Sequence, residues 1–181
     1  MTDNLDMTNP FERLIFNYAN ARRSWESWCF MVNHQVKVDR PEIRAYINND
    51  SFLFHFRYLA LKDFHIEITK IIKESDNCKD NIFKLLKALT NESNPKKDEA
   101  MICLVKLNEC KAIMKSIIEA RDKYFAHLDP NFKEYLKDLI IMDVNHCFVA
   151  IENSIMTLTS KEILLSQLDK IPSRDEFQLK M

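Results

Sequence analysis

Residues 94–128, NPKKDEAMICLVKLNECKAIMKSIIEARDKYFAHL, contain the clearest structural pattern in the chain. Apolar side chains recur there at steps of three and four residues, which is the spacing of one face of an α-helix. This seam consists of Cys103, Leu107, Cys110, Met114 and Ile117. Asn94 and Pro95 supply a side-chain cap and a first-turn proline in front of it. The pattern predicts a long helix that begins after Pro95 and ends near Phe125.

A first helix is expected upstream, because Asn9 supplies a cap, Pro10 fits the first turn, and Glu12 follows three residues after the cap. Its apolar stripe places two tryptophans on one buried face and consists of Phe11, Leu14, Tyr18, Ala21, Trp25, Trp28 and Val32. Residues 34–50 are expected to form a less regular connection, with a short helix after Pro41.

A second long helix is expected to be capped by Asp50 or Ser51 and to end near Ser75. Its seam is Leu53, Phe56, Ala60, Phe64, Ile68 and Ile71. A shorter helix is expected at about residues 80–90, where large apolar side chains are again concentrated. A polar loop then leads to the helix of residues 94–128.

Asp129 and Pro130 repeat the cap-and-proline signal and open a last helix. Its stripe is Leu136, Ile140, Val144, Cys147, Ile151, Ile155 and Leu158. The chain becomes polar after Ser160. We therefore expect a single helical domain over residues 1–181, with its core at about residues 9–160 and a polar tail at residues 161–181.

Glycine is absent from the 181 residues, although average usage would give about 13. Dinucleotide-binding folds, phosphate-cradling loops and tight β-hairpins need glycine for close backbone approach or positive φ. Their absence leaves helices that are joined by Asn, Asp, Ser and Pro. The sequence predicts an all-α protein, an antiparallel bundle of about five helices.

Charge and cysteine content limit the partners that the chain can have. The formal charge is −1, so a broad basic surface is not expected and any contact with RNA must be local. The five cysteines lack the spacing of a zinc site or a disulfide framework, and we expect reduced core thiols without a bound metal or cofactor. The apolar runs are too short to span a membrane and the polar N-terminus is not a signal peptide, so a cytoplasmic protein is expected.

Arg121 occupies the next position of the seam in residues 94–128. A guanidinium there would lie among side chains that are expected to be buried, and a buried arginine needs an anionic partner. That partner would be a carboxylate, a subunit interface or an anionic group of a ligand. His127 follows six residues later, where a new helix begins, so the helical repeat does not fix the direction of its side chain.

The segment Arg121-Asp122-Lys123-Tyr124-Phe125-Ala126-His127 resembles the R-x(4-6)-H motif of the HEPN superfamily, the higher eukaryotes and prokaryotes nucleotide-binding proteins. Asp122 matches the polar residue that typically follows the arginine in that motif. The resemblance covers most of residues 10–160 and includes a general similarity to the abortive-infection-associated branch.

The resemblance implies a helical bundle that forms a homodimer along the motif helices and cleaves RNA without a metal ion. His127 would act as general base or acid at the 2′-hydroxyl or the leaving oxygen, Arg121 would neutralise charge on the phosphorane, and Asp122 would orient one of them. Histidine exchanges protons near neutral pH, and arginine offers phosphate a planar fork of donors. A role as toxin or in antiviral defence is implied, and an antitoxin protein stays open as a partner.

This sequence departs from one regulatory pattern of the superfamily. Some toxin members carry a tyrosine two residues after the histidine, which the antitoxin modifies. Asp129 occupies that position here, so we do not expect that mode of regulation.

A non-catalytic interpretation stays open beside the ribonuclease. His127 in a last helical turn would complement the helix dipole, and Arg121 would pair with an acid across the bundle. The chain would then be a helical module for dimerisation or for binding a nucleotide or a partner protein. Arg121 beside His127 in an open cleft would favour the ribonuclease, and Arg121 locked to a buried carboxylate would favour the module.

Asp143 and His146 lie one helical turn apart, so they could share a metal ion or hold the catalytic histidine in place. His146 falls in a stripe with Leu139, Met142 and Val149, so we expect a core histidine that is bonded to Asp143.

Other charged residues have structural interpretations. Asp63, His65 and Glu67 lie within one helical turn and are expected on a solvated face. The basic pairs at residues 22–23 and 96–97 could touch RNA phosphates, but we interpret them as solvated charges.

Overall fold

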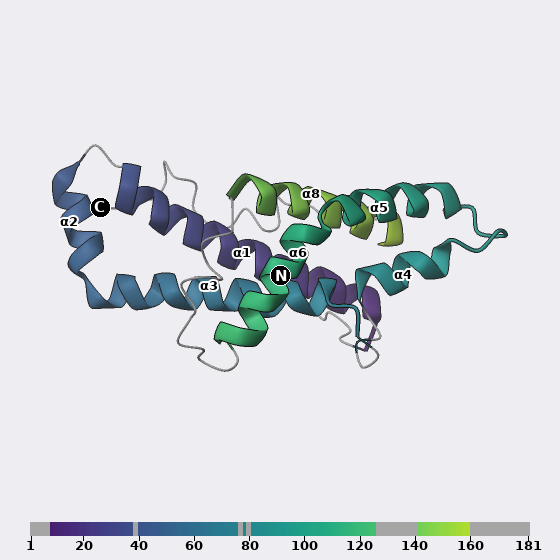
Figure 1. Ribbon diagram of the computed structural model, residues 1–181, viewed down its shortest axis with the longest axis horizontal. Coiled ribbons are helices and arrows are strands. Elements are labelled where there is room, and N and C mark those ends of the chain that lie inside the picture. The colour runs from purple at the N-terminus through teal and green to yellow at the C-terminus, as the bar shows by residue number, and fades with distance from the viewer. Residues whose placement is uncertain (1–7, 38–39, 76–77, 79–80, 126–140, 160–181) are drawn as a thin grey trace.

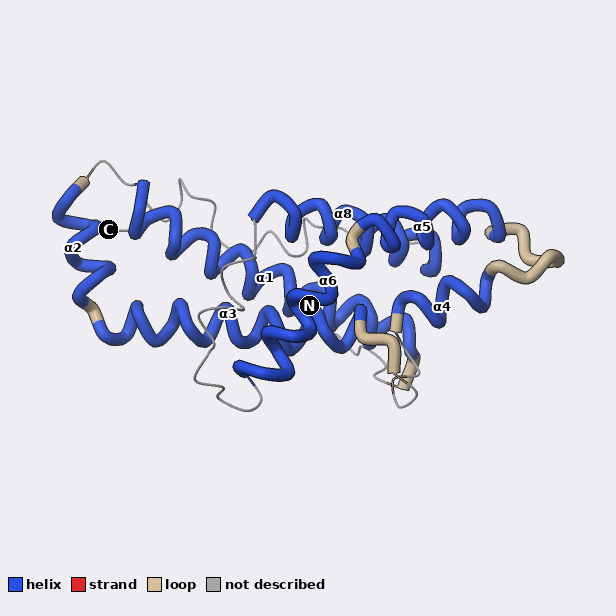
Figure 2. Tube along the Cα trace, viewed as in Figure 1, coloured by secondary structure: helices blue, strands red, loops and turns tan. Residues whose placement is uncertain are grey.

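The structure is a computed structural model that describes residues 8–37, 40–75, 78, 81–125 and 141–159. Helices make up most of this part of the chain, and no strand occurs in it (Figure 2). The predicted all-α class is therefore confirmed. Within the same residues, no helix combines the length and the apolar character that a membrane span requires.

Two long helices, α1 (Pro10–Lys37) and α3 (Ser51–Ile72), lie side by side along the longest axis, and α2 (Pro41–Asn49) joins them at one end (Figure 1). The backbone N–H of Phe11 donates to Asn9 Oδ1 at 2.9 Å, and that of Leu53 donates to Asp50 Oδ1 at 2.8 Å. Both predicted helix starts are confirmed, as is the short helix after Pro41. The irregular connection expected from residue 34 is wrong for residues 34–37, which continue α1.

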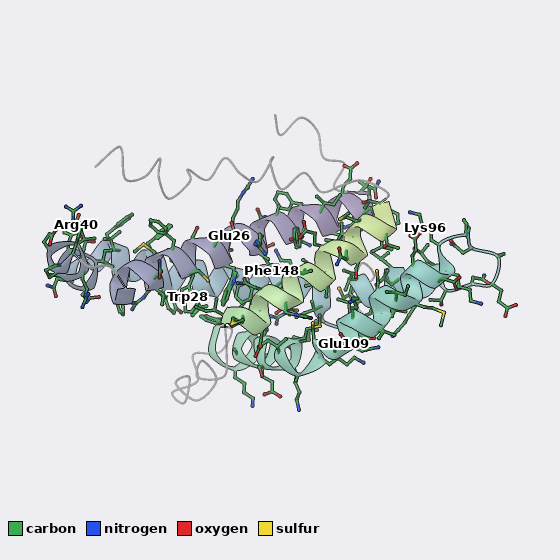
Figure 3. The ribbon with its side chains drawn as sticks, turned by 90° about the horizontal axis from the view of Figure 1, so that it is seen from above. Glu26, Trp28, Arg40, Lys96, Glu109 and Phe148 are labelled. Atoms are coloured by element: carbon green, nitrogen blue, oxygen red, sulfur yellow. The ribbon has the colours of Figure 1, made fainter. Side chains whose placement is uncertain are left out.

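Three further helices build the other half of the bundle: α4 (Ile82–Leu89), α5 (Lys97–Glu109) and α8 (Ile141–Thr159). α8 packs against α1, α4 and α5. Lys96 lies just before α5, near the end of α8 (Figure 3). Its Nζ donates to the carbonyl oxygen of Thr157 in the last turn of α8 at 2.5 Å. Lys96 therefore stabilises a helix C-terminus, and its interpretation as a purely solvated charge is wrong.

Four aromatic residues hold α1, α3 and α8 together. Tyr18 and Trp25 of α1, Phe64 of α3 and Phe148 of α8 are all at most 1% exposed. The ring of Phe64 lies 4.8 Å from that of Trp25 and 6.0 Å from that of Phe148, measured between centroids. Trp25 Nε1 donates to Asn145 Oδ1 at 2.9 Å, so the polar edge of this buried indole is satisfied.

The helix predicted to run from Pro95 to Phe125 is divided into three parts: α5, α6 (Lys111–Ala120) and the π-helical turn η1 (Arg121–Phe125). The chain bends at Cys110, and α6 turns away from α5 and crosses α3 (Figure 1). The predicted seam is nevertheless buried from Cys103 to Ile117. α5 buries it against α4 and α8, whereas α6 buries it mainly against α3. One straight helix cannot cover both surfaces, which explains the bend.

The cysteines lie in and around this core. Cys103, Cys110 and Cys147 are buried, as expected, whereas Cys29 and Cys78 are half-buried. A hydrogen bond between the thiols of Cys110 and Cys147, together with burial, raises the pKa of Cys147 far above its ordinary value. These contacts fasten the bend at Cys110 to α8.

Two stretches of α3 and α8 face solvent against expectation. The α3 seam is buried from Ala60 onward, but Phe56 is 42% exposed. On α8, Met142 and Val149 are 79% and 54% exposed, and Asp143 and His146 lie on the same exposed side. The expectation of a core histidine at position 146 is therefore wrong, because α8 buries a different face, centred on Val144, Cys147, Ile151 and Ile155.

Candidate functional site

The candidate site begins where α6 ends. Met114, Ile117 and Ala120 anchor α6 in the core. Arg121 follows directly, and its side chain is 32% exposed. The expectation that Arg121 takes a buried position of the seam is wrong, since Ala120 takes that position and moves Arg121 to the edge of the core.

The turn η1 explains how the chain continues from there. Among the described side chains that follow Ala120, the next buried one is that of Phe125, which is 7% exposed. This five-residue step is the hydrogen-bond repeat of a π-helix, and single π-helical turns occur frequently at functional sites. The wider turn displays Arg121 and Asp122 while Phe125 stays inside.

Arg121 and Asp122 form an ionic cluster with a residue from a distant part of the chain. Arg121 Nη1 donates to Asp122 Oδ1 at 2.5 Å, and Lys73 Nζ donates to Asp122 Oδ2 at 2.7 Å. Lys73 is the C-cap residue of α3. Both oxygens of the carboxylate thus have a cationic partner, and we call these three residues the Arg121–Asp122–Lys73 cluster.

The cluster lies at the surface and carries a net positive charge. Lys73 and Asp122 have side chains that are 35% and 38% exposed. Two cations and one carboxylate give a formal charge of +1, in a chain whose total charge is −1. Such a cluster can bind an anion because Arg and Lys keep donors that a single carboxylate cannot occupy.

α3 also presents a buried histidine to the same turn. His65 is fully buried, its Nδ1 lies 2.8 Å from the carbonyl oxygen of Leu61, and its Nε2 has no hydrogen-bond partner. Its ring lies 4.6 Å from that of Phe125, measured between centroids. Burial lowers the pKa of His65 to about 4, because it penalises the charged form.

The predicted solvated face at residues 63–67 is therefore wrong for two of its three members. His65 is fully buried and Glu67 is 8% exposed. Glu67 Oε1 accepts a hydrogen bond from Lys70 Nζ, while its Oε2 is unpartnered. From Ala60 onward α3 is covered by α1 on one side and by α6 and η1 on another, so its buried face is wider than an amphipathic pattern indicates.

Sequence reasoning placed two site residues here and missed two others. The structure brings Arg121 and Asp122 into contact, whereas His127 lies outside the described residues. Lys73 and Asp122 are 49 residues apart in the chain, and no local pattern could have joined them. His65 could have been found from the run of apolar residues around it, since Leu61, Phe64 and Ile68 surround it at helical spacing.

Comparisons with protein-family models, with curated proteins and with solved structures find no match. The relationship to the HEPN superfamily therefore stays a prediction that depends on the motif at residues 121–127. Within the described part of the chain, no three His, Cys, Asp or Glu side chains are grouped so that they could hold a metal ion.

Proposed function

We propose that this chain is a metal-independent endoribonuclease whose site consists of Arg121, Asp122 and His127. The observation that carries the proposal is the surface position of the Arg121 guanidinium, which is held by Asp122 in a π-helical turn that ends two residues before His127. The contact between Arg121 and Asp122 supports the orienting role that the motif implies for Asp122. A guanidinium that is held in a fixed direction can bind a phosphate by charge-assisted hydrogen bonds with little loss of entropy.

The chemistry is an internal transfer within RNA. A base removes the proton from the ribose 2′-hydroxyl, the 2′-oxygen attacks the neighbouring phosphorus, and the bond from phosphorus to the 5′-oxygen breaks. The leaving oxygen takes a proton from an acid, which gives a 2′,3′-cyclic phosphate and a 5′-hydroxyl. His127 moves one of these protons, and Arg121 stabilises the negative charge on the five-coordinate phosphorus.

A homodimer would complete this scheme, because two copies of His127 across a twofold axis can act as base and acid on one phosphate. The seam of α5 and α6 does not supply the dimer interface, since it is buried within the chain and Arg121 pairs with Asp122. Support comes instead from apolar side chains that α5 and α8 leave exposed: Met101, Ile102, Val105, Met142, Val149 and Met156. α5 and α8 pack against each other, and exposed apolar residues on neighbouring helices favour an interaction surface.

The proposed biological setting is a cytoplasmic toxin or antiviral defence system of the abortive-infection type. Uncontrolled cleavage of RNA would harm the cell that makes the enzyme, so an antitoxin or a similar partner protein is part of the proposal. The near-neutral charge of the chain means that RNA would be recognised at the site and not attracted over the whole surface.

A second candidate is a non-catalytic module that dimerises or binds a partner through α5 and α8. The same exposed apolar side chains favour it, because Met142, Val149 and Met156 follow a seven-residue spacing on α8. We prefer the ribonuclease because Arg121 is not locked to a buried carboxylate. Its partner Asp122 is 38% exposed and shares its charge with Lys73.

The deciding experiment incubates purified protein with single-stranded RNA in EDTA. We expect cleavage with cyclic phosphate ends in EDTA, since His127 and Arg121 perform the proton transfer and charge neutralisation that a metal would otherwise supply. His127→Ala should lower the rate about 10²- to 10⁴-fold, and Arg121→Ala should remove a few kcal/mol of transition-state stabilisation, roughly 3. The double variant should be little worse than either, because residues that act as a unit are not additive.

Matched controls are His55→Ala on α3 and Arg44→Ala on α2, which replace exposed residues of the same types. Both should cleave RNA at the wild-type rate. If wild-type protein cleaves no RNA and His127→Ala leaves its effect on cell growth unchanged, the module is the better proposal.

A further inference from the structure

We propose that Lys73 is a second phosphate-binding cation of this site and holds the RNA backbone beside Arg121. The inference rests on the proposed function, because it assigns a role at the same site. Lys73 comes from α3 and lies outside the motif at residues 121–127. Its Nζ lies 2.7 Å from Asp122 Oδ2, on the carboxylate that also binds Arg121.

The backbone of Lys73 is fixed on both sides. Its N–H donates to the carbonyl oxygen of Thr69 at 3.0 Å, and its own carbonyl oxygen accepts from Asn81 Nδ2 at 2.9 Å. Asn81 is fully buried, and its Oδ1 caps α4 by accepting from the N–H of Lys84 at 2.8 Å. A cation that starts from a fixed backbone loses less entropy on binding a phosphate than one on a loose loop.

The net charge of the cluster also favours a role for Lys73 in phosphate binding. Arg121 and Asp122 together are neutral, so a phosphate that approaches this pair meets no net attraction. Lys73 restores a charge of +1, which is what one bridging phosphate of RNA neutralises. Asp122 lies between the two cations and binds one with each oxygen. Each cation keeps further donors that the carboxylate does not occupy.

The competing explanation is that Lys73 only ties α3 to η1. A half-exposed ion pair of this kind contributes little to folding, and a lysine at a helix C-terminus also complements the helix dipole. The two explanations differ in RNA binding. A structural tie predicts no change in the salt dependence of binding, whereas a phosphate contact predicts a smaller dependence once the contact is lost.

The test measures binding of a fluorescent single-stranded RNA to full-length protein that carries His127→Ala, so that the RNA stays intact. Adding Lys73→Met should weaken binding about 10- to 100-fold, the size of one charge-assisted hydrogen bond. The slope of log K against log salt should decrease in magnitude by about 0.7, as expected for one phosphate contact on a single strand. Lys73→Arg should restore most of both values.

Lys87→Met is the matched control, because Lys87 Nζ also pairs with a carboxylate from another segment, Glu74 Oε2, at 2.8 Å. It should leave affinity and slope unchanged. A second arm repeats Lys73→Met in an Asp122→Asn background. If Lys73 contacts phosphate, Lys73→Met still lowers the affinity for RNA in this background. If Lys73 only pairs with Asp122, the substitution leaves the affinity unchanged.

The outcomes separate the inference from the proposed function. Cleavage by the wild type together with an unchanged slope for Lys73→Met overturns the inference and leaves the ribonuclease standing. A slope that depends on Lys73 in a protein that cleaves no RNA keeps the phosphate site and rejects the catalytic role. If the protein binds no RNA at 50 mM salt, where such contacts are strongest, both are rejected.

Discussion

The turn η1 contacts α3 in two places, once through an exposed ion pair and once through a buried aromatic contact. On one side Asp122 meets Lys73 at 2.7 Å, and both side chains are more than one-third exposed. On the other side Phe125 packs on His65 with ring centroids 4.6 Å apart, and His65 has no exposure to solvent. One contact is ionic and wet, the other aromatic and dry, although they are only three residues apart along η1.

Within this short turn, the buried contact contributes to the stability of the fold and the exposed contact is available for binding. Burial of Phe125 and His65 supplies free energy of folding through removal of apolar surface from water. The Arg121–Asp122–Lys73 cluster supplies little of it, because water screens its charges. The same exposure leaves the cations of the cluster accessible to a ligand. We therefore expect changes on the dry side to unfold the turn and changes on the wet side to alter binding.

The largest expected effect on stability comes from breaking the dry contact with Phe125→Ala. The side chain is 7% exposed and packs on the rings of Tyr58 and His65. Its removal leaves a cavity that should lower the free energy of unfolding by about 3–5 kcal/mol. For a chain of this size, that loss lowers Tm by roughly 10 °C. Urea and thermal unfolding followed by circular dichroism measure both quantities.

Phe52→Ala is the matched control for that variant, because it removes the same ring from a side chain that is 70% exposed. Its effect on the free energy of unfolding should stay below about 1 kcal/mol. Equal losses for the two variants would show that Phe125 is not a core residue and would remove the dry half of the comparison.

The helices themselves could be predicted from the sequence because their signals are local. Caps such as Asn9 and Asp50 form the expected hydrogen bonds, and period-three-and-four stripes such as Cys103 to Ile117 are buried. The bend at Cys110 could not be predicted, since the stripe continues through it unbroken. Which surface each half of the stripe covers depends on helices far away in the chain, and local periodicity holds no information on that.

The site was predictable in part for the same reason. Arg121 and Asp122 are neighbours in the chain, so their contact requires only local structure. The exposure of Arg121 and the burial of His65 were both expected the other way round. Arg121 leaves the seam because η1 changes the repeat after Ala120, and His65 is buried because α6 and η1 cover a second side of α3. Both causes are tertiary.

The contact between Phe125 and His65 should make the stability of the protein depend on pH. His65 has its pKa lowered to about 4 by burial, from an ordinary value of 6.5, so the unfolded chain binds a proton more readily than the folded one. Stability is therefore complete above about pH 6.5 and is lost as pH falls from there toward 4. The loss from this one residue should reach about 3 kcal/mol, measured from urea unfolding at several pH values in that window.

His65→Leu tests the origin of this loss, because leucine packs but does not titrate. Carboxylates elsewhere titrate in both proteins, so the difference between wild type and variant isolates His65. His55→Leu, at an exposed position of α3, should keep the wild-type pH dependence. Parallel curves for wild type and His65→Leu between pH 6.5 and 4 would contradict the prediction.

The smallest expected effect on stability comes from the wet contact, through Asp122→Asn. This variant keeps the size of the side chain and removes the charge that Arg121 and Lys73 share. Because all three side chains are about one-third exposed, the free energy of unfolding should change by less than about 1 kcal/mol. In a cycle with Lys73→Met, the coupling between the two substitutions should stay within about 1 kcal/mol as well.

The same substitution should change RNA cleavage far more than it changes folding. An asparagine no longer holds the guanidinium of Arg121 by a charged bond, so the cation loses its fixed direction toward the phosphate and kcat should fall, by about 10-fold or more for a misplaced group. Stability and kcat, measured on the same preparation, therefore move apart for Asp122→Asn and together for Phe125→Ala. If Asp122→Asn instead lowers the free energy of unfolding by as much as Phe125→Ala does, the ionic contact is structural, and the division of η1 into a dry and a wet side does not hold.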